Sequence, residues 1–102
     1  MGKPEASVEN YLVNRVKHEG GEIRKVSWIG RKGAPDRLIW WPHPYHTGPL
    51  YAWVECKAPG EEVDWRSNQG REIRRMREAG WVVYVVNSRE QVDEMIAEVK
   101  GA

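Results

Sequence analysis

The sequence has one cysteine, no phenylalanine and no long apolar run. The single cysteine, Cys56, excludes an internal disulfide and fits a reducing compartment. No apolar stretch reaches the roughly 18 residues of a membrane span, and the start of the chain lacks a signal-peptide pattern, so we expect no membrane partner. The net charge of +1 shows no excess of one sign, so the distribution of charge matters more than its sum.

What the chain does contain indicates a globular protein. Its 102 residues are 40% hydrophobic and 30% charged, which predicts one domain over 1–102. Periodicity and turn residues predict an α/β chain in the order αβββαβα. The expected helices are 5–18, 64–79 with Asp64 as N-cap, and a last helix capped by Ser88. The expected strands are 22–29, 38–41, 50–54 and 81–86, and the last of these should be covered on both faces.

The two middle strands form a predicted hairpin around the turn 42–49. If they fold back symmetrically, Asp36 lies opposite Glu55, and Glu55 shares a face with Lys57. Two carboxylates and a lysine would then converge, which is typical of a divalent cation site beside a cationic catalytic group. The simpler interpretations are a Pro-Asp turn and an exposed strand end with alternating charges.

Glu9 is a candidate on the first helix. The apolar residues Leu12, Val13 and Val16 follow it at helical spacing, so Glu9 borders the packed face. Glu9 either lies at the edge of the packed face with its carboxylate in solvent, or has its side chain held toward the site. Glu5, one turn earlier, is a competing candidate.

Gln69 is a polar residue in line with a buried stripe, because Ile73, Met76 and Gly80 follow it four, seven and eleven residues later. A buried amide must have a hydrogen-bond partner. That partner is either a helix cap or one of the groups of the site, a carboxylate or a metal-bound water.

Basic residues gather on the second helix and in the loop before Asp36. They form either a solvated surface or a phosphate-binding surface. The candidates for DNA contact are Arg31, Lys32, Arg37, Arg66 and Arg74; the helix also carries Arg71, Arg75 and Arg77.

A zinc site is weakly indicated. His18, His43, His46 and Cys56 lack the paired spacing of zinc ligands, and Cys56 should point away from Glu55. Oxygen ligands favour Mg²⁺ or Mn²⁺ instead.

The order of these motifs resembles the VRR-NUC domain of the PD-(D/E)xK nuclease superfamily. The resemblance runs from about residue 5 to residue 96 and consists of Gly33-x-Pro35-Asp36, Glu55-x-Lys57 and Gln69, after a helix with Glu9. It implies a mixed central sheet flanked by helices. It also implies that small members of this kind, from phages and bacteria, are homodimers that resolve branched DNA such as four-way junctions.

The resemblance also implies roles for the site residues. Asp36 and Glu55 would bind the metal together with the backbone carbonyl of Cys56, and Lys57 would be the catalytic lysine. Glu9 and Gln69 would hold metal-bound waters or assist the ligands.

We therefore interpret the sequence as that of a Mg²⁺- or Mn²⁺-dependent DNA endonuclease in the cytoplasm of a bacterial or phage-infected cell. Two other interpretations stay open: a non-catalytic DNA-binding module that uses the arginines alone, and a nuclease accessory subunit whose six tryptophans serve a protein interface. A monomeric enzyme would more plausibly cut flaps or single strands.

Overall fold

A computed structural model describes residues 4–42 and 48–101. Its elements are α1 (Pro4–His18), β1 (Glu22–Lys25), β2 (Arg37–Trp41), β3 (Leu50–Cys56), α2 (Asn68–Glu78), β4 (Val83–Val86) and α3 (Arg89–Val99). The strands form one sheet in the order β1-β2-β3-β4, antiparallel except for the parallel pair β3 and β4. The predicted αβββαβα order and mixed sheet are therefore confirmed.

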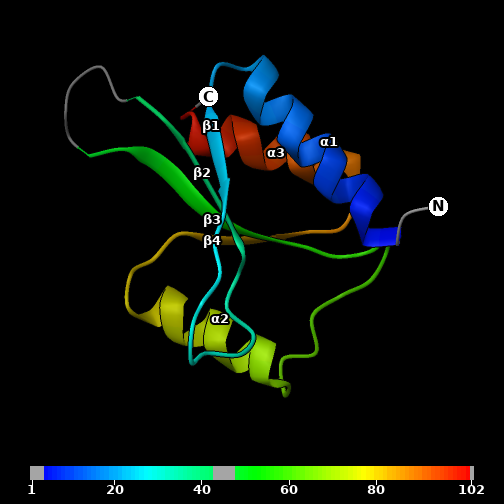
Figure 1. The fold of residues 1–102 in the computed structure, drawn as a ribbon, viewed down its shortest axis with the longest axis vertical. Helices are drawn as coiled ribbons and strands as arrows, with labels where there is room; N and C mark the ends of the chain where they lie inside the picture. Colours follow the sequence, from blue (N-terminus) through cyan, green and yellow to red (C-terminus); the bar gives the residue numbers. More distant parts are fainter. Residues whose placement is uncertain (1–3, 43–47, 102) are drawn as a thin grey trace.

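Helices cover the sheet on both faces (Figure 1). On one face α1 and α3 pack together through Leu12, Val16, Val92 and Ile96, which are among the buried residues of the larger core cluster. These side chains recur at helical spacing, as the sequence predicts. The Tyr11 hydroxyl joins the two helices at the surface by donating to the Asp93 carboxylate at 2.9 Å.

The other face carries α2 and a smaller core. Ile73 of α2 is fully buried and belongs to one cluster with Trp53, Val63 and Val83. Burial of a side chain of this size is worth roughly 1.5–3 kcal/mol. Because α2 has only 11 residues, part of the hairpin on this face remains uncovered, and an apolar groove lies there between Leu38, Trp40, Pro49, Tyr51, Trp53 and Trp81.

The hairpin has the register that its symmetry predicts. Arg37 pairs with Val54 and Trp41 with Leu50. Continuing this register by one residue places Asp36 opposite Glu55. The predicted register of the hairpin is thus confirmed by the strand pairing.

Three predicted boundaries are wrong. The second helix begins at Asn68 with Ser67 as its N-cap, because Asp64 instead accepts from the backbone N–H of Arg66 and forms a turn before the helix. β1 ends at Lys25, after which Val26 donates to the carbonyl of Asp36.

The last strand also begins later than predicted, at Val83. Trp81 and Val82 precede it and are exposed, because they lie beyond the part of the sheet that α2 covers. None of the helices in residues 4–42 and 48–101 is long and apolar enough to cross a membrane.

Candidate active site

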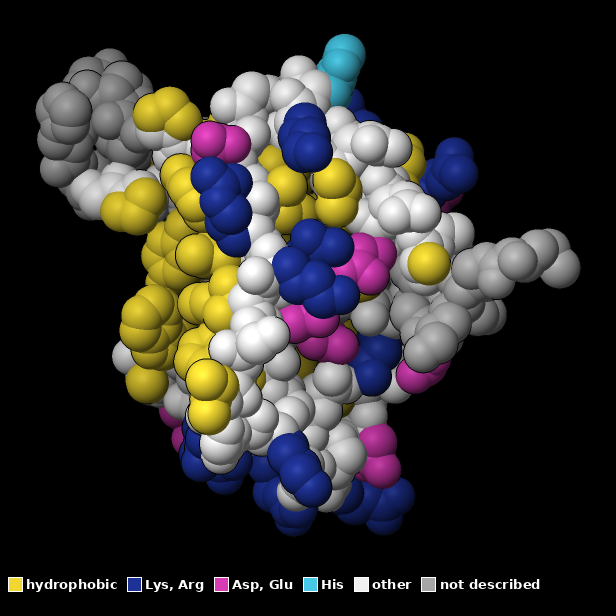
Figure 2. All heavy atoms as spheres, in the orientation of Figure 1, with side chains coloured by type: hydrophobic (Ala, Val, Ile, Leu, Met, Phe, Trp, Pro, Cys, Tyr) yellow, Lys and Arg dark blue, Asp and Glu magenta, His cyan; other side chains and the backbone are white. Residues whose placement is uncertain are grey.

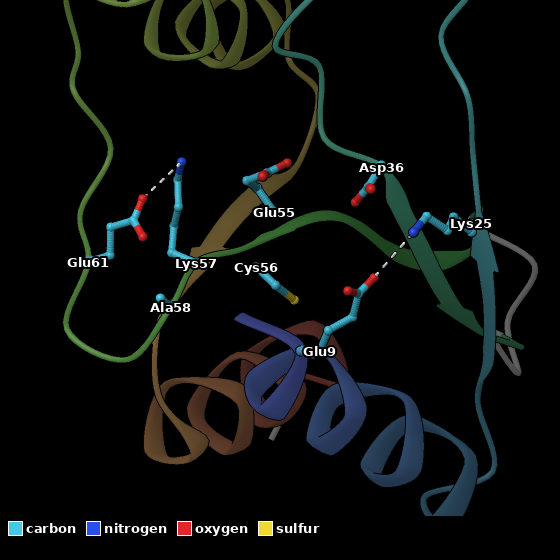
Figure 3. Close-up of a pocket in the computed structure, with 9 residues that line it drawn as sticks. Glu9, Lys25, Asp36, Glu55, Cys56, Lys57, Ala58 and Glu61 are labelled. Atoms are coloured by element: carbon cyan, nitrogen blue, oxygen red, sulfur yellow. Dashed lines mark ion pairs between the residues drawn. The ribbon is translucent and has the colours of Figure 1, made fainter. Parts of the chain in front are cut away.

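The predicted catalytic and metal-binding residues other than Gln69 line one cleft of about 430 Å³ between α1, the hairpin and the loop after β3 (Figure 3). Its walls are Ala6, Glu9, Lys25, Asp36, Glu55, Cys56, Lys57, Ala58 and Glu61. Three of its four acidic side chains are ones that the sequence singled out. Segments far apart in the chain therefore meet at this cleft.

Asp36 and Glu55 are brought together by the hairpin. Asp36 immediately precedes β2, and its carbonyl accepts from Val26 at 2.8 Å, which fixes its backbone. Just before it, Pro35 is fully buried and its carbonyl accepts from the Trp28 indole at 2.7 Å. The backbone carbonyls of Pro35 and Asp36 are therefore both fixed by hydrogen bonds. A solvent-exposed turn does not require such bonds.

The two carboxylates influence each other electrostatically. The pKa of Glu55 is raised to about 7, first by burial, then by the negative charge of Asp36 and to a smaller extent by that of Glu9. Lys57 and a hydrogen bond from Gln69 oppose this rise. Glu55 is thus partly protonated near neutral pH unless another positive charge joins the site.

Lys57 lies on the same side of β3 as Glu55, whereas Cys56 between them points toward α1 (Figure 3). Its ammonium is 3.8 Å from the Glu61 carboxylate, and its backbone N–H donates to Val86 at 2.8 Å. The lysine is thereby anchored to β4 and oriented by an acidic partner that the sequence analysis did not identify.

Glu9 projects from α1 into the cleft. Its carboxylate accepts from Arg37 Nε at 2.8 Å and lies 4.0 Å from Lys25 Nζ. Of the two alternatives that the sequence leaves open for Glu9, these two basic partners favour a side chain held toward the site. The side chain of the competing candidate, Glu5, lies outside the part of the chain that the structure describes.

Gln69 meets the site at the first turn of α2. Its side chain is hydrogen-bonded to the Glu55 carboxylate, so of the two partners expected for this amide, the structure supplies the site carboxylate. Gly33 packs against the same turn with φ +84°, and a Cβ built on it would lie 2.5 Å from the Gln69 Cα. A side chain at position 33 is therefore excluded both by backbone conformation and by space.

Cys56 is poorly suited to bind zinc. Burial raises the pKa of its thiol to about 12, so the thiolate that zinc requires is disfavoured. His18 is exposed near the end of α1, and His43 and His46 lie outside the described residues.

The predicted DNA-binding residues differ in exposure and in their partners. All are exposed except Arg37, which is half-buried. Three of them pair with a carboxylate within the protein: Arg31 with Glu72, Arg37 with Glu9 and Arg66 with Asp64. Sequence reasoning missed Lys25, Glu61 and Glu72; Lys25 and Glu61 carry no local pattern, whereas Glu72 follows Gln69 by three residues on α2 and could have been found from that spacing.

The charge distribution on this face is consistent with a cleft for an anionic substrate. Figure 2 shows acidic side chains near the middle of the face with lysines and arginines around them, and further basic side chains at the end where α2 lies. Apolar side chains gather along the hairpin edge.

The oxygen atoms of the cleft are the candidate ligands for a metal ion. Within residues 4–42 and 48–101, no three His, Cys, Asp or Glu side chains are grouped closely enough to hold an ion by themselves. The expected ligands contain only two such side chains, Asp36 and Glu55, and a backbone carbonyl. Their oxygen chemistry and their unbalanced negative charge fit Mg²⁺ or Mn²⁺.

The fold is αβββαβα, with Asp36 directly before β2 and Glu55-x-Lys57 at the end of the neighbouring strand β3. No family model matches the sequence. The protein named "Putative nuclease p44" of Acyrthosiphon pisum secondary endosymbiont phage 1 is 40% identical over 86 residues, which cover 84% of this chain and 85% of the phage protein.

A solved structure of a VRR_NUC domain is similar as well. It superposes with a TM-score of 0.79 at 36% identity, over 93% of this chain and 96% of that one. The chain belongs to the VRR-NUC family of nucleases.

Proposed function

We propose that the protein is a metal-dependent DNA endonuclease. The observation that carries this proposal is the placement of Asp36 and Glu55 opposite each other on neighbouring strands, with Lys57 on the same side of β3. A module that only binds DNA has no use for paired carboxylates close to a polyanion, because they repel phosphate. This argues against the non-catalytic alternative.

In this proposal Asp36, Glu55 and the backbone carbonyl of Cys56 hold Mg²⁺ or Mn²⁺, and Glu9 and Gln69 assist through water. A cation bound there would polarise the scissile phosphate and make a water acidic enough to attack it. Gln69 supports this role because its hydrogen bond orients the Glu55 carboxylate. Arg37 and Lys25 do the same for Glu9.

Lys57 supplies the positive charge at the mouth of the cleft. Its ammonium can orient the attacking water and offset the negative charge that grows on the phosphate oxygens. Glu61, 3.8 Å away, restricts where that ammonium points. An oriented cation stabilises a transition state better than a mobile one because less reorganisation is needed.

In this proposal the DNA backbone extends from the cleft over the basic residues of the loop before Asp36 and of α2. Lys32, Arg66 and Arg74 are exposed and can contact phosphates directly. Arg31 and Arg37 keep some donors free beyond their carboxylate partners, since a guanidinium carries five N–H groups.

The preferred substrate in this proposal is branched DNA, such as a four-way junction, cut by a homodimer in the cytoplasm of a bacterial or phage-infected cell. A junction presents symmetric strands, and a twofold dimer presents two equivalent sites. A chain of 102 residues with one cleft has a small footprint for judging branch geometry alone.

The test is cleavage of labelled duplex, single-stranded, flap and four-way junction DNA, each with Mg²⁺, Mn²⁺ or EDTA. We expect cation-dependent cutting, strongest on the junction. Binding without cutting under all conditions would favour the non-catalytic module, and cutting of flaps or single strands alone would retain the nuclease and overturn the substrate assignment.

A further inference from the structure

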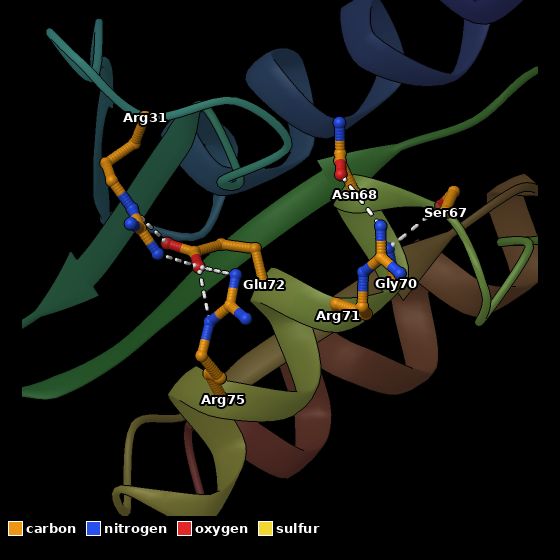
Figure 4. A network of polar contacts seen from close by, with 7 residues as sticks. All are labelled: Arg31, Ser67, Asn68, Gly70, Arg71, Glu72 and Arg75. Carbon is orange, nitrogen blue, oxygen red and sulfur yellow. Dashed lines mark hydrogen bonds and ion pairs between the residues drawn. The ribbon is translucent and has the colours of Figure 1, made fainter.

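Glu72 on α2 bridges two arginines (Figure 4). Its Oε1 accepts from Arg31 Nη2 at 2.6 Å, from Arg75 Nε at 3.1 Å and from Arg75 Nη2 at 2.9 Å; its Oε2 accepts from Arg31 Nε at 3.2 Å. Arg31 is in the loop that leads to Asp36, and Arg75 is one turn further along the helix. One carboxylate thus fixes both guanidiniums.

The three side chains differ in exposure. The Glu72 side chain is 9% exposed, whereas those of Arg31 and Arg75 are 53% and 59% exposed. The carboxylate is therefore covered, and the two cations face solvent. Hydrogen bonds from Arg31 lower the pKa of Glu72, so it remains ionised and the group carries a net charge of +1.

Each guanidinium still has donors to offer. Arginine carries five N–H groups, and Arg31 and Arg75 each use two nitrogens for Glu72. The remaining N–H groups belong to guanidiniums whose orientation is already fixed. Ordering them for an oxyanion then costs less side-chain entropy than ordering free arginines would.

This group is connected to the cleft through Gln69 and Gly33. Glu72 follows Gln69 by three residues, so the two share a side of α2 about 4.5 Å apart along its axis. Gln69 is hydrogen-bonded to Glu55, and the loop with Arg31 packs on the same turn through Gly33. A DNA strand at the carboxylates would pass within reach of both arginines.

We propose that Arg31 and Arg75 form a preorganised clamp for a DNA backbone phosphate that flanks the scissile one, and that Glu72 is its positioning residue. This inference rests on the proposed nuclease function and deepens it. It assigns a role to Arg75, which no motif indicates. It also assigns a phosphate-binding role to Arg31, because the ion pair with Glu72 orients the guanidinium for phosphate.

The charge change in Glu72→Gln gives the sharpest test. This variant removes a negative charge, so bulk electrostatics predicts tighter DNA binding, whereas loss of a clamp predicts weaker binding. Binding is measured by fluorescence anisotropy on labelled junction DNA over a salt series, with Asp36→Asn as background to prevent cutting. We expect Glu72→Gln to weaken binding severalfold.

The arginines are tested in the same way. Arg31→Gln and Arg75→Gln should each weaken binding roughly tenfold, and the two together should reduce the slope of log K against log salt by about 0.9, the value of one phosphate contact. Arg89→Gln on α3, on the other side of the sheet, is the matched control and should change the slope little.

A purely structural ion pair would give a different result. It would lower the melting temperature of the Glu72 variant and leave the salt slope of the arginine variants unchanged, which would overturn the clamp. If Glu72→Gln does not fold, the double variant Arg31→Gln/Arg75→Gln is used instead. A reduction of its slope of log K against log salt by less than the value of one phosphate contact, about 0.9, would overturn the proposal. Failure of the wild-type protein to cut or bind any DNA would instead overturn the nuclease function.

Discussion

Gly33 lies so close to Gln69 that the backbones of the loop and of α2 touch. A Cβ on Gly33 would be 2.5 Å from the Cα and 2.7 Å from the amide nitrogen of Gln69. Gly33 and Asp36 belong to the same short loop, and Gln69 is hydrogen-bonded to Glu55. The separation between loop and helix therefore sets how the two carboxylates face each other.

This contact predicts the effect of Gly33→Ala. An alanine with a left-handed φ costs about 1–2 kcal/mol, and here its methyl group would also push Gln69 away. Gly30→Ala is the matched control, because Gly30 has a similar φ of +78° but nothing within 4 Å of its Cβ position. Thermal melts should show a loss for both and a larger one for Gly33→Ala, and only Gly33→Ala should lose most of its nuclease activity. Equal effects would mean that the close approach is unimportant.

Asp36→Asn and Glu55→Gln should each abolish cleavage while the fold is retained. DNA binding should persist or tighten, because a negative charge near phosphate is removed. Cleavage assays with Mg²⁺ or Mn²⁺ and anisotropy on the same DNA measure the two effects. Full cation-dependent activity in either variant would falsify the assignment of the site.

Lys57→Ala should reduce kcat by several orders of magnitude without preventing metal binding. Lys57→Arg should also be poor, because a guanidinium is wider and stays protonated. Mn²⁺ titration by calorimetry separates the two properties. Glu61→Gln, which frees the Lys57 ammonium from its ion pair at 3.8 Å, should have a much smaller effect. A Lys57→Ala enzyme that cuts at a near-normal rate would contradict the catalytic role.

The pKa of Glu55 predicts how stability depends on pH. Its folded-state pKa of about 7 is above the ordinary value of 4.5, so the folded protein holds the proton more tightly than the unfolded chain. The stability from this group is fully present below about pH 4.5 and is lost as the pH rises through 7. In EDTA, Glu55→Gln should therefore raise the melting temperature relative to wild type at pH 8 and change it little at pH 4.

The same electrostatics predicts a cation effect. Mg²⁺ or Mn²⁺ should stabilise the wild-type protein more at pH 8 than at pH 5, and should stabilise the Glu55→Gln variant less. If the difference between wild type and Glu55→Gln in EDTA is the same at pH 4 and pH 8, Glu55 does not titrate as described.

The proposed dimer has its own test. We expect a dimer at micromolar concentration and paired cuts on opposing arms of a four-way junction. The exposed Trp81, beside the apolar groove of the hairpin, is a natural anchor for such an interface. Sedimentation that shows only monomer under active conditions would contradict the dimer, leave the metal site in place and favour flaps or single strands as substrates.

Local patterns were sufficient for the element order and for the hairpin that aligns Asp36 with Glu55. A symmetric hairpin fixes register by counting, and the side-chain period of two then fixes the face of Lys57. The start of α2 could not be placed this way, because Asp64 and Ser67 are both good caps, and only the packing of Gly70 against Asp64 and Trp65 favours the later one.

The ion pairs of the site could not be predicted from the sequence. Arg31 and Glu72 are 41 residues apart, and Glu9 and Arg37 are 28 apart. Nothing in the local pattern shows which arginine meets which carboxylate, because that depends on how α1 and α2 sit on opposite faces of the sheet. For this reason the sequence indicates Arg31 and Arg37 as candidate DNA contacts but does not indicate their carboxylate partners Glu72 and Glu9.

The anchoring of Lys57 to β4 has a consequence for the newly made chain. Its backbone N–H is bonded to the carbonyl of Val86, and β3 receives its second neighbour only when β4 joins the sheet. All four acidic residues of the cleft precede this strand in the chain, Glu61 being the last of them. The position of Lys57 proposed for catalysis therefore depends on residues 83–86, which follow every acidic residue of the cleft and must join the sheet before the lysine is held in place.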